Sequence, residues 1–105
     1  MTRELCRISA AVALLLFSEQ ALAVSECSGH VTQIYAGDNG AVYFFLDVGA
    51  SGVLAPGDPN QKNAEALGVT ALAANKTAAI RFTADGVDCS AATIRNDMQG
   101  LWLRP

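Results

Sequence analysis

Hydrophobic and polar residues alternate along two segments that follow residue 27. The first is HVTQIYA at residues 30–36, and the second is AVYFFLDV at residues 41–48. Both segments are rich in β-branched and aromatic residues, which favour strands. The intervening GDNG, at residues 37–40, supplies residues that adopt the positive φ angles of a tight hairpin turn. The pattern therefore predicts an antiparallel pair of strands.

The second of these segments has aromatic residues on both faces, because successive side chains of a strand point to opposite sides. One face carries Val42, Phe44 and Leu46, and the other carries Tyr43, Phe45 and Asp47. One face can fill the core. We expect the other to be covered by a helix, a loop or a partner chain, since large apolar patches are seldom left open.

A single helix is predicted in the middle of the chain. Asp58 suits the N-cap position, and Pro59 suits the first helical position, where its missing N–H costs nothing. The helix then spans residues 60–74 and ends at Asn75, which serves as a left-handed cap. The face that we expect to pack on a sheet is narrow and consists of Ala64, Leu67, Ala71 and Ala74.

Three further strands complete the pattern. A short strand is expected around Val53 and Leu54, within a Gly-rich loop at residues 49–57, and longer ones in TAAIRFT at 77–83 and MQGLWLR at 98–104. In TAAIRFT, inward positions are Ala78, Ile80 and Phe82, and outward positions are Arg81 and Thr83. The predicted fold is mainly β with one helix. The order of the elements favours a small five-stranded, partly open OB-fold barrel with its helix between strands three and four.

The N-terminal segment has the features of a secretion signal. Arg3 and Arg7 precede an apolar run at residues 8–17, and Ala-Leu-Ala at residues 21–23 forms a cleavage site. The apolar run is too short to cross a hydrocarbon core of about 30 Å. We therefore predict a signal peptide at residues 1–23 and a single domain at residues 24–105. The expected location is periplasmic or secreted, without membrane insertion after cleavage.

The cysteine count supports an oxidising compartment. Cleavage after Ala23 removes Cys6 and leaves Cys27 and Cys89 in the mature chain. An even pair of cysteines in an exported chain predicts a disulfide. The bond would close a loop over most of the mature domain, so the loop-closure entropy predicts a stabilisation of roughly 4 kcal/mol.

The charge distribution argues against nucleic acid as a partner. The formal net charge is −3, and removal of the signal peptide, with two basic and two acidic residues, leaves it unchanged. The basic residues of the mature chain are scattered singly. Proteins that bind a phosphate backbone gather lysine and arginine on one surface. The sequence therefore predicts no nucleic-acid partner.

No catalytic or metal-binding constellation stands out. His30 is the only histidine, and nothing in the sequence positions it with Ser28 and Asp47 as a Ser/His/Asp arrangement. One histidine and two cysteines do not fill a zinc site. The turn with Asp85 and Asp88 has too few oxygen ligands for calcium and suits Asp because this side chain bonds its own backbone. We expect neither an enzyme nor a bound cofactor or metal ion.

The motifs in their order resemble one known group of proteins. These motifs are SGHVTQI at 28–34, VYFFL at 42–46, ANKTAAIRF at 74–82, and Cys89 shortly after a DG pair. The chain is similar to the OB-fold B subunits of secreted bacterial AB5 toxins, particularly subtilase cytotoxin B subunit-like small secreted proteins. This resemblance implies an OB barrel, assembly into pentameric rings, and binding of sialylated glycans in shallow surface pockets. It also implies that Ser28 contributes to sugar binding.

We therefore expect a non-catalytic binding module with a glycan or a protein as partner. The glycan-binding surface is predicted at Ser28, His30, Arg81 and Thr83. Trp102 and Tyr43 could stack on a sugar, although aromatic residues on strands more commonly serve a core or an interface. The aromatic second strand suggests a homo-oligomer. The alternatives are a small periplasmic inhibitor of, or partner to, an extracytoplasmic hydrolase, and a structural envelope protein.

Overall fold

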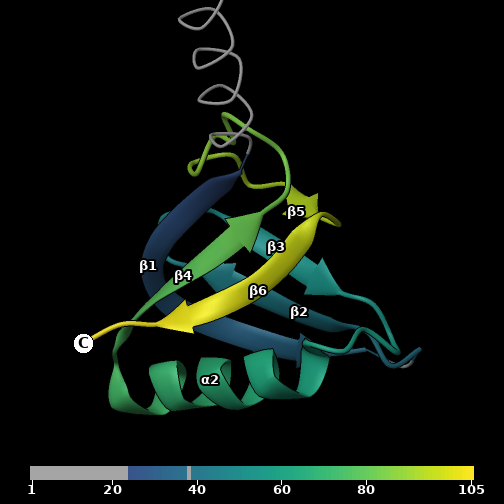
Figure 1. The fold of residues 1–105 in the computed structure, drawn as a ribbon. Coiled ribbons are helices and arrows are strands. Elements are labelled where there is room, and N and C mark those ends of the chain that lie inside the picture. The colour runs from purple at the N-terminus through teal and green to yellow at the C-terminus, as the bar shows by residue number, and fades with distance from the viewer. Residues whose placement is uncertain (1–23, 38) are drawn as a thin grey trace, which may run out of the picture.

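The computed structural model describes residues 24–37 and 39–105 (Figure 1). The predicted signal peptide at residues 1–23 lies outside the described residues. Within the described part, no helix is long and apolar enough to cross a membrane.

One six-stranded sheet and one helix make up the described fold. The elements are β1 (Ser25–Ala36), β2 (Val42–Leu46), β3 (Ser51–Leu54), α2 (Gln61–Ala74), β4 (Thr77–Phe82), β5 (Ile94–Arg95) and β6 (Met98–Leu103). The strand order in the sheet is β5-β3-β2-β1-β4-β6. Only the β3–β5 pair is parallel among these, and the other neighbours are antiparallel. The prediction of a mainly β fold with one helix is confirmed.

The sheet is open and mixed and has six strands, whereas the sequence predicted a five-stranded, partly open barrel. The final extended segment of the chain is divided into β5 and β6 by residues 96–97. β5 pairs with β3, whereas β6 pairs with β4. Because β5 and β6 pair with different strands, they form the two edges of the sheet and bring the number of strands to six.

β1 is long enough to serve both halves of the sheet. Its first half, Ser25 to His30, pairs with β4, and its second half, from Val31 onward, pairs with β2. The β1–β2 register shifts between Val31 and Gln33, and such irregularities bend a strand. Figure 1 shows β1 curving around the molecule, so that the sheet wraps around a common interior.

The interior is filled by alternate residues of the strands. Phe44, Phe82, Leu54 and Ile80 are the largest fully buried side chains. On β2 the predicted face of Val42, Phe44 and Leu46 is buried, while Tyr43 and Phe45 stay partly exposed. The alternation of β2 is therefore confirmed.

Helix α2 lies across one end of the sheet (Figure 1). Its N-cap is Asn60 instead of Asp58, because Asp58 Oδ1 accepts a hydrogen bond from the Asn60 backbone N–H at 2.8 Å and forms a turn ahead of the helix. Asn75 is the left-handed C-cap, as predicted, with φ 53°. The predicted packing face is partly correct, since Ala64 and Ala71 are buried. Ala74 is exposed because it occupies the last helical position.

Gly68 allows α2 to approach the core closely. A Cβ atom at this position would lie 2.9 Å from Phe44 Cε1 and 3.0 Å from Ile34 Cδ1. Both distances are shorter than ordinary van der Waals contact. Gly68 therefore lowers the intrinsic helix propensity of α2 but allows the helix to pack closely against β1 and β2.

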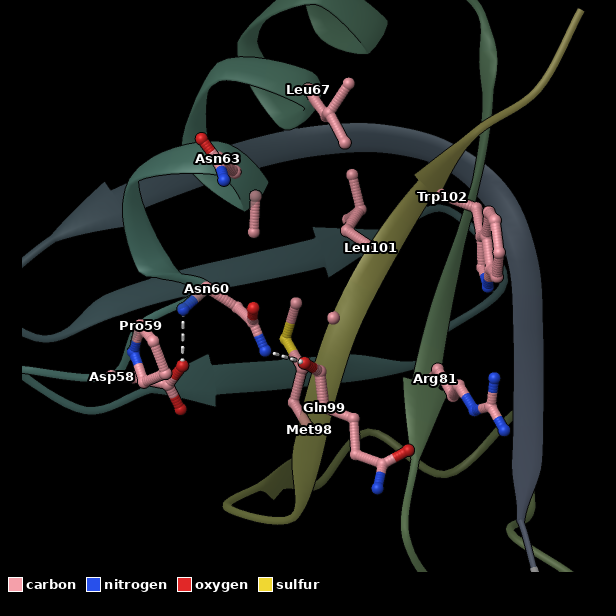
Figure 2. Close-up of a pocket in the computed structure, with 12 residues that line it drawn as sticks. Asp58, Pro59, Asn60, Asn63, Leu67, Arg81, Met98, Gln99, Leu101 and Trp102 are labelled. Carbon is pink, nitrogen blue, oxygen red and sulfur yellow. Dashed lines mark hydrogen bonds between the residues drawn. The ribbon is translucent and has the colours of Figure 1, made fainter.

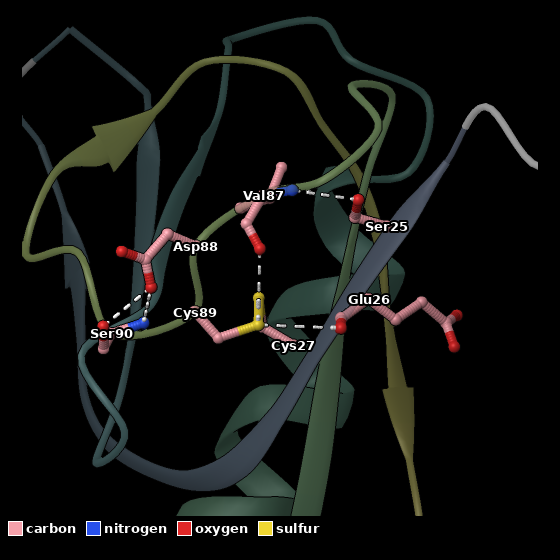
Figure 3. Close-up of a disulfide and its surroundings, with 7 residues drawn as sticks. All are labelled: Ser25, Glu26, Cys27, Val87, Asp88, Cys89 and Ser90. Atoms are coloured by element: carbon pink, nitrogen blue, oxygen red, sulfur yellow. Dashed lines mark hydrogen bonds between the residues drawn. A yellow bond between two sulfur atoms is a disulfide. The ribbon is translucent and has the colours of Figure 1, made fainter.

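The predicted disulfide between Cys27 and Cys89 is confirmed, with a Cα–Cα distance of 5.4 Å. Cys27 belongs to β1 and is 1% exposed, and Cys89 belongs to the loop between β4 and β5. Figure 3 shows a second tie nearby, where Ser25 Oγ accepts a hydrogen bond from the Val87 backbone N–H at 3.2 Å. The disulfide and this hydrogen bond both connect the β4–β5 loop to the beginning of β1. Such a bond is typical of proteins in oxidising compartments.

Candidate ligand-binding groove

A groove of about 630 Å³ lies between the N-terminal turns of α2 and strand β6. It is lined by Asp58, Pro59, Asn60, Asn63, Ala64, Leu67, Arg81, Met98, Gln99, Gly100, Leu101 and Trp102. Figure 2 shows β6 passing between α2 on one side and the side chains of Arg81 and Trp102 on the other. Its lining is part apolar and part polar, and its volume falls in the range of small-molecule sites.

Two neighbouring amide side chains fix the position of α2 beside this groove. Asn60 Nδ2 donates a hydrogen bond to the Gln99 carbonyl oxygen of β6 at 3.0 Å. Gln61 Nε2 donates to the carbonyl oxygens of Leu54, at the end of β3, and Gly40, at 3.0 and 2.8 Å. These hydrogen bonds fix the start of the helix next to β6 and the end of β3.

The floor of the groove on the outward side of β6 is formed by Gly100. No atom lies within 4 Å of the position that a Cβ would occupy there. On β6, Gly100 pairs with Arg81 of β4, and Trp102 pairs with Ala79 of β4. Because paired residues of adjacent strands share a face, Arg81 and Trp102 flank a position where the backbone of β6 carries no side chain.

Arg81 has hydrogen-bonding capacity that its surroundings do not use. Its Nε is a buried side-chain nitrogen without a hydrogen-bond partner among residues 24–37 and 39–105. Glu26 stands opposite Arg81 in the β1–β4 register, yet its carboxylate pairs with Arg104 through an Nη2–Oε1 contact of 3.2 Å. An unpartnered buried donor is costly unless a ligand or water satisfies it. Since the Nε atom itself is buried, only the remaining nitrogens of this partly exposed side chain could reach a ligand.

Trp102 provides the aromatic surface of the groove. Its side chain is half exposed, at 50%. An exposed indole presents a flat apolar face together with one N–H donor. Arg81, which lines the same groove on the same side of β6, adds a planar set of N–H donors. These are the contacts that a sugar, with apolar C–H faces and many hydroxyl groups, requires.

The four predicted glycan-binding residues do not lie together at this groove. Arg81 lines it, whereas Ser28, His30 and Thr83 do not. Ser28 and His30 are exposed on β1, paired with Ala79 and Thr77 of β4. Thr83 follows β4 and donates from Oγ1 to Asp97 Oδ2 at 3.3 Å.

His30 is paired with Asp47 at the surface. The Nδ1–Oδ2 distance is 3.5 Å, and the His30 backbone N–H donates to Asp47 Oδ1 at 3.0 Å. The carboxylate lies directly over Gly29, where a Cβ would come within 2.5 Å of Asp47 Oδ1. The sequence did not predict this pairing. The Asp47 carboxylate accepts a hydrogen bond from the backbone of β1, so its contact with His30 helps to join β1 to the end of β2.

Asp88 and Asp97 both have hydrogen-bond partners within the fold. Asp88 accepts hydrogen bonds from the Ser90 hydroxyl and backbone N–H at 2.7 and 3.0 Å, and these bonds lower its pKa. Asp97 pairs with Arg95 through bonds of 2.8 and 3.0 Å, which lower the Asp97 pKa despite its partial burial. The turn role predicted for Asp88 is confirmed. In the described parts of the chain, no three His, Cys, Asp or Glu residues gather as a metal site.

Sequence reasoning missed most of the groove. Asn60, Asn63 and Gln99 resemble ordinary helix-start and strand residues, and Gly100 resembles a weak point in a strand. Among the residues of the groove, the sequence marked Arg81 as a candidate for glycan binding and Trp102 as a candidate for stacking. The others gain their meaning only from the contact between α2 and β6, segments far apart in the sequence.

Comparison of the chain with protein-family models, with curated proteins and with solved structures found no match.

Proposed function

We propose that this protein is a secreted or periplasmic, non-catalytic binding module that holds an oligosaccharide in the groove between α2 and β6. The observation that carries the proposal is that Arg81 on β4 and Trp102 on β6 both lie next to Gly100 on one face of the sheet and line the same groove. A sugar ring on this glycine would contact the indole face and accept a hydrogen bond from the guanidinium. The Cys27–Cys89 disulfide supports the proposed location, because disulfides persist in oxidising compartments.

The topology supports an OB-type fold as part of the same proposal. The two edges of the sheet, β5 and β6, are separated in the chain by residues 96–97 alone. Joined into one strand, they would connect β3 to β4 and give five strands, with the helix between strands three and four, as in an OB-fold. OB-folds commonly bind oligosaccharides and oligonucleotides on their surface. The scattered basic residues of this chain favour the saccharide.

A single site of this kind binds weakly. Each hydrogen bond contributes roughly 1 kcal/mol net, since it replaces a bond to water. Useful affinity therefore requires several sites acting together, and avidity can exceed a single affinity by a factor of about 10² to 10⁴. We propose that the protein self-associates, consistent with the exposed Val69 and Leu72 on the outer surface of α2.

The groove can be tested with three variants. Trp102→Ala removes the stacking surface, Arg81→Gln removes the charged donor, and Gly100→Phe fills the floor without a backbone clash. The matched control is Val48→Ala, an exposed apolar residue outside the groove and away from α2. We expect the wild type and the control to bind the same ligands on a broad glycan array. Trp102→Ala and Gly100→Phe should each weaken binding about tenfold or more, which corresponds to roughly 1.4 kcal/mol.

Two outcomes would contradict the proposal. The first is that no glycan binds on the array, and the second is that Trp102→Ala and Gly100→Phe bind like the wild type. If the array is negative and a single extracytoplasmic hydrolase co-purifies in a manner that requires Trp102, the inhibitor function replaces the glycan-binding one. Circular dichroism of each variant verifies that the fold is retained.

A further inference from the structure

A second aromatic surface lies on the outward face of β1, β2 and β3. Tyr35, Tyr43 and Val53 occupy directly paired positions on these strands, and together we call them the tyrosine row. The two tyrosine ring centroids are 5.6 Å apart, with an interplanar angle of 41°. Tyr35 is 55% exposed. No member of the tyrosine row lines the groove beside β6.

The tyrosine row is electrically neutral, as is the adjacent row of the sheet. Gln33 pairs with Phe45 in that adjacent row, and neither carries a charge. The chain as a whole has a net charge of −3. A charged ligand would find no complementary group among these five side chains, so the surface suits a neutral partner.

The exposed apolar area distinguishes a small ligand from a second copy of the chain. A tyrosine side chain offers about 200 Å² when fully exposed. Tyr35 is roughly half exposed, and Tyr43, Phe45 and Val53 are less so. The exposed area of these four side chains is then at most about 300 Å². A stable protein interface buries about 800 Å² per partner. These four side chains by themselves supply less than half of the area that a stable dimer buries, whereas a sugar ring needs only a small apolar surface.

We propose that Tyr35 and Tyr43 form a second saccharide-binding site, which takes neutral pyranose rings. The C–H face of a ring packs on the exposed face of Tyr35, and its hydroxyl groups bond to the tyrosine hydroxyls and the Gln33 amide. The strands hold both tyrosines in direct register, and a tyrosine loses little rotamer freedom on binding. The site is therefore preorganised. It is independent of the groove, and either can exist without the other.

The test is a nuclear magnetic resonance titration of the full mature chain. The probes are cellohexaose, chitohexaose and maltohexaose, each added up to about 10 mM, because a shallow site has millimolar affinity. We expect at least one probe to shift the ring resonances of Tyr35 and Tyr43. Tyr35→Ala should weaken this binding about tenfold, while the matched Tyr35→Phe keeps the ring and should stay within about threefold. Both variants alter an exposed side chain, and their melting temperatures report whether the fold is retained.

Trp102→Ala separates this site from the groove. If the tyrosine resonances still shift in that variant, the second site stands whether or not the groove binds glycans. The proposal is overturned if none of the three probes shifts the tyrosine resonances, or if Tyr35→Ala binds like the wild type. It is also overturned if sedimentation shows a dimer that Tyr35→Ala dissociates, because a second copy would then cover the tyrosine row.

Discussion

Loss of the Cys27–Cys89 disulfide should remove a large share of the stability of the domain. The bond joins residues 62 positions apart. For a closed loop of this length, the loop-closure entropy corresponds to about 4 kcal/mol. Domains have about 0.05–0.15 kcal/mol of stability per residue, so residues 24–105 are expected to have a total between about 4 and 12 kcal/mol. Without the bond, the weaker end of this range would leave the domain unfolded.

The measurement compares three forms of a protein that spans residues 24–105 by urea unfolding: the oxidised wild type, the wild type kept reduced, and the double variant Cys27→Ala with Cys89→Ala. Reduction removes the cross-link but keeps both side chains. The double variant also removes the Cys27 side chain, which is 1% exposed in the core. The difference between the last two forms therefore isolates packing from cross-linking.

We expect the reduced wild type to lose about 4 kcal/mol of unfolding free energy. The double variant should lose a further 1 kcal/mol or so, because a small cavity replaces the sulfur. The slope of free energy against urea should also rise, since the unfolded chain without a cross-link exposes more surface. A loss below about 1 kcal/mol in the reduced wild type would refute the entropic reasoning. Alkylation of both thiols without reductant in exported protein would refute the disulfide itself.

Three further variants, with Gly100→Ala as a control, test the core and the Arg95–Asp97 ion pair. Gly68→Ala should lower stability despite its better helix propensity, because its Cβ would lie 2.9 Å from Phe44 Cε1, whereas Gly100→Ala meets no atom within 4 Å and should change urea stability by less than about 0.5 kcal/mol. Phe44→Ala removes a fully buried ring and should cost about 3–5 kcal/mol; a loss below about 1 kcal/mol would contradict its place in the core. The hydrogen bonds from Arg95 lower the folded-state pKa of Asp97, so the stabilisation by this pair is complete above the unfolded carboxyl pKa of about 3.9 and is lost as the pH falls through the lower folded value. Asp97→Asn should flatten that acid-side loss in a series of melting curves, and an unchanged pH profile would argue against the pair.

The sequence by itself determined the features that depend on neighbouring residues or on simple counts. The alternation in β2 placed Phe44 in the core because strand side chains repeat every second residue. Asn75 ended the helix because it tolerates the left-handed conformation. The disulfide between Cys27 and Cys89 could be predicted because no other cysteine remains after the predicted signal cleavage. Each of these inferences needs only local geometry or elimination.

The tertiary structure alone decided how separate segments meet. Asp is a favoured N-cap residue, and yet the helix begins after Asn60 and not after Asp58. The Asn60 side chain donates a hydrogen bond to Gln99 of β6. The last extended segment became two strands because β3 and β4 each pair with a different part of it. The groove depends on the pairing of β4 with β6, since this pairing places Arg81 beside Gly100. Local periodicity encodes which side of a strand is apolar, but the distance between α2 and β6 is set by packing across the whole sheet, and no short stretch of sequence records it.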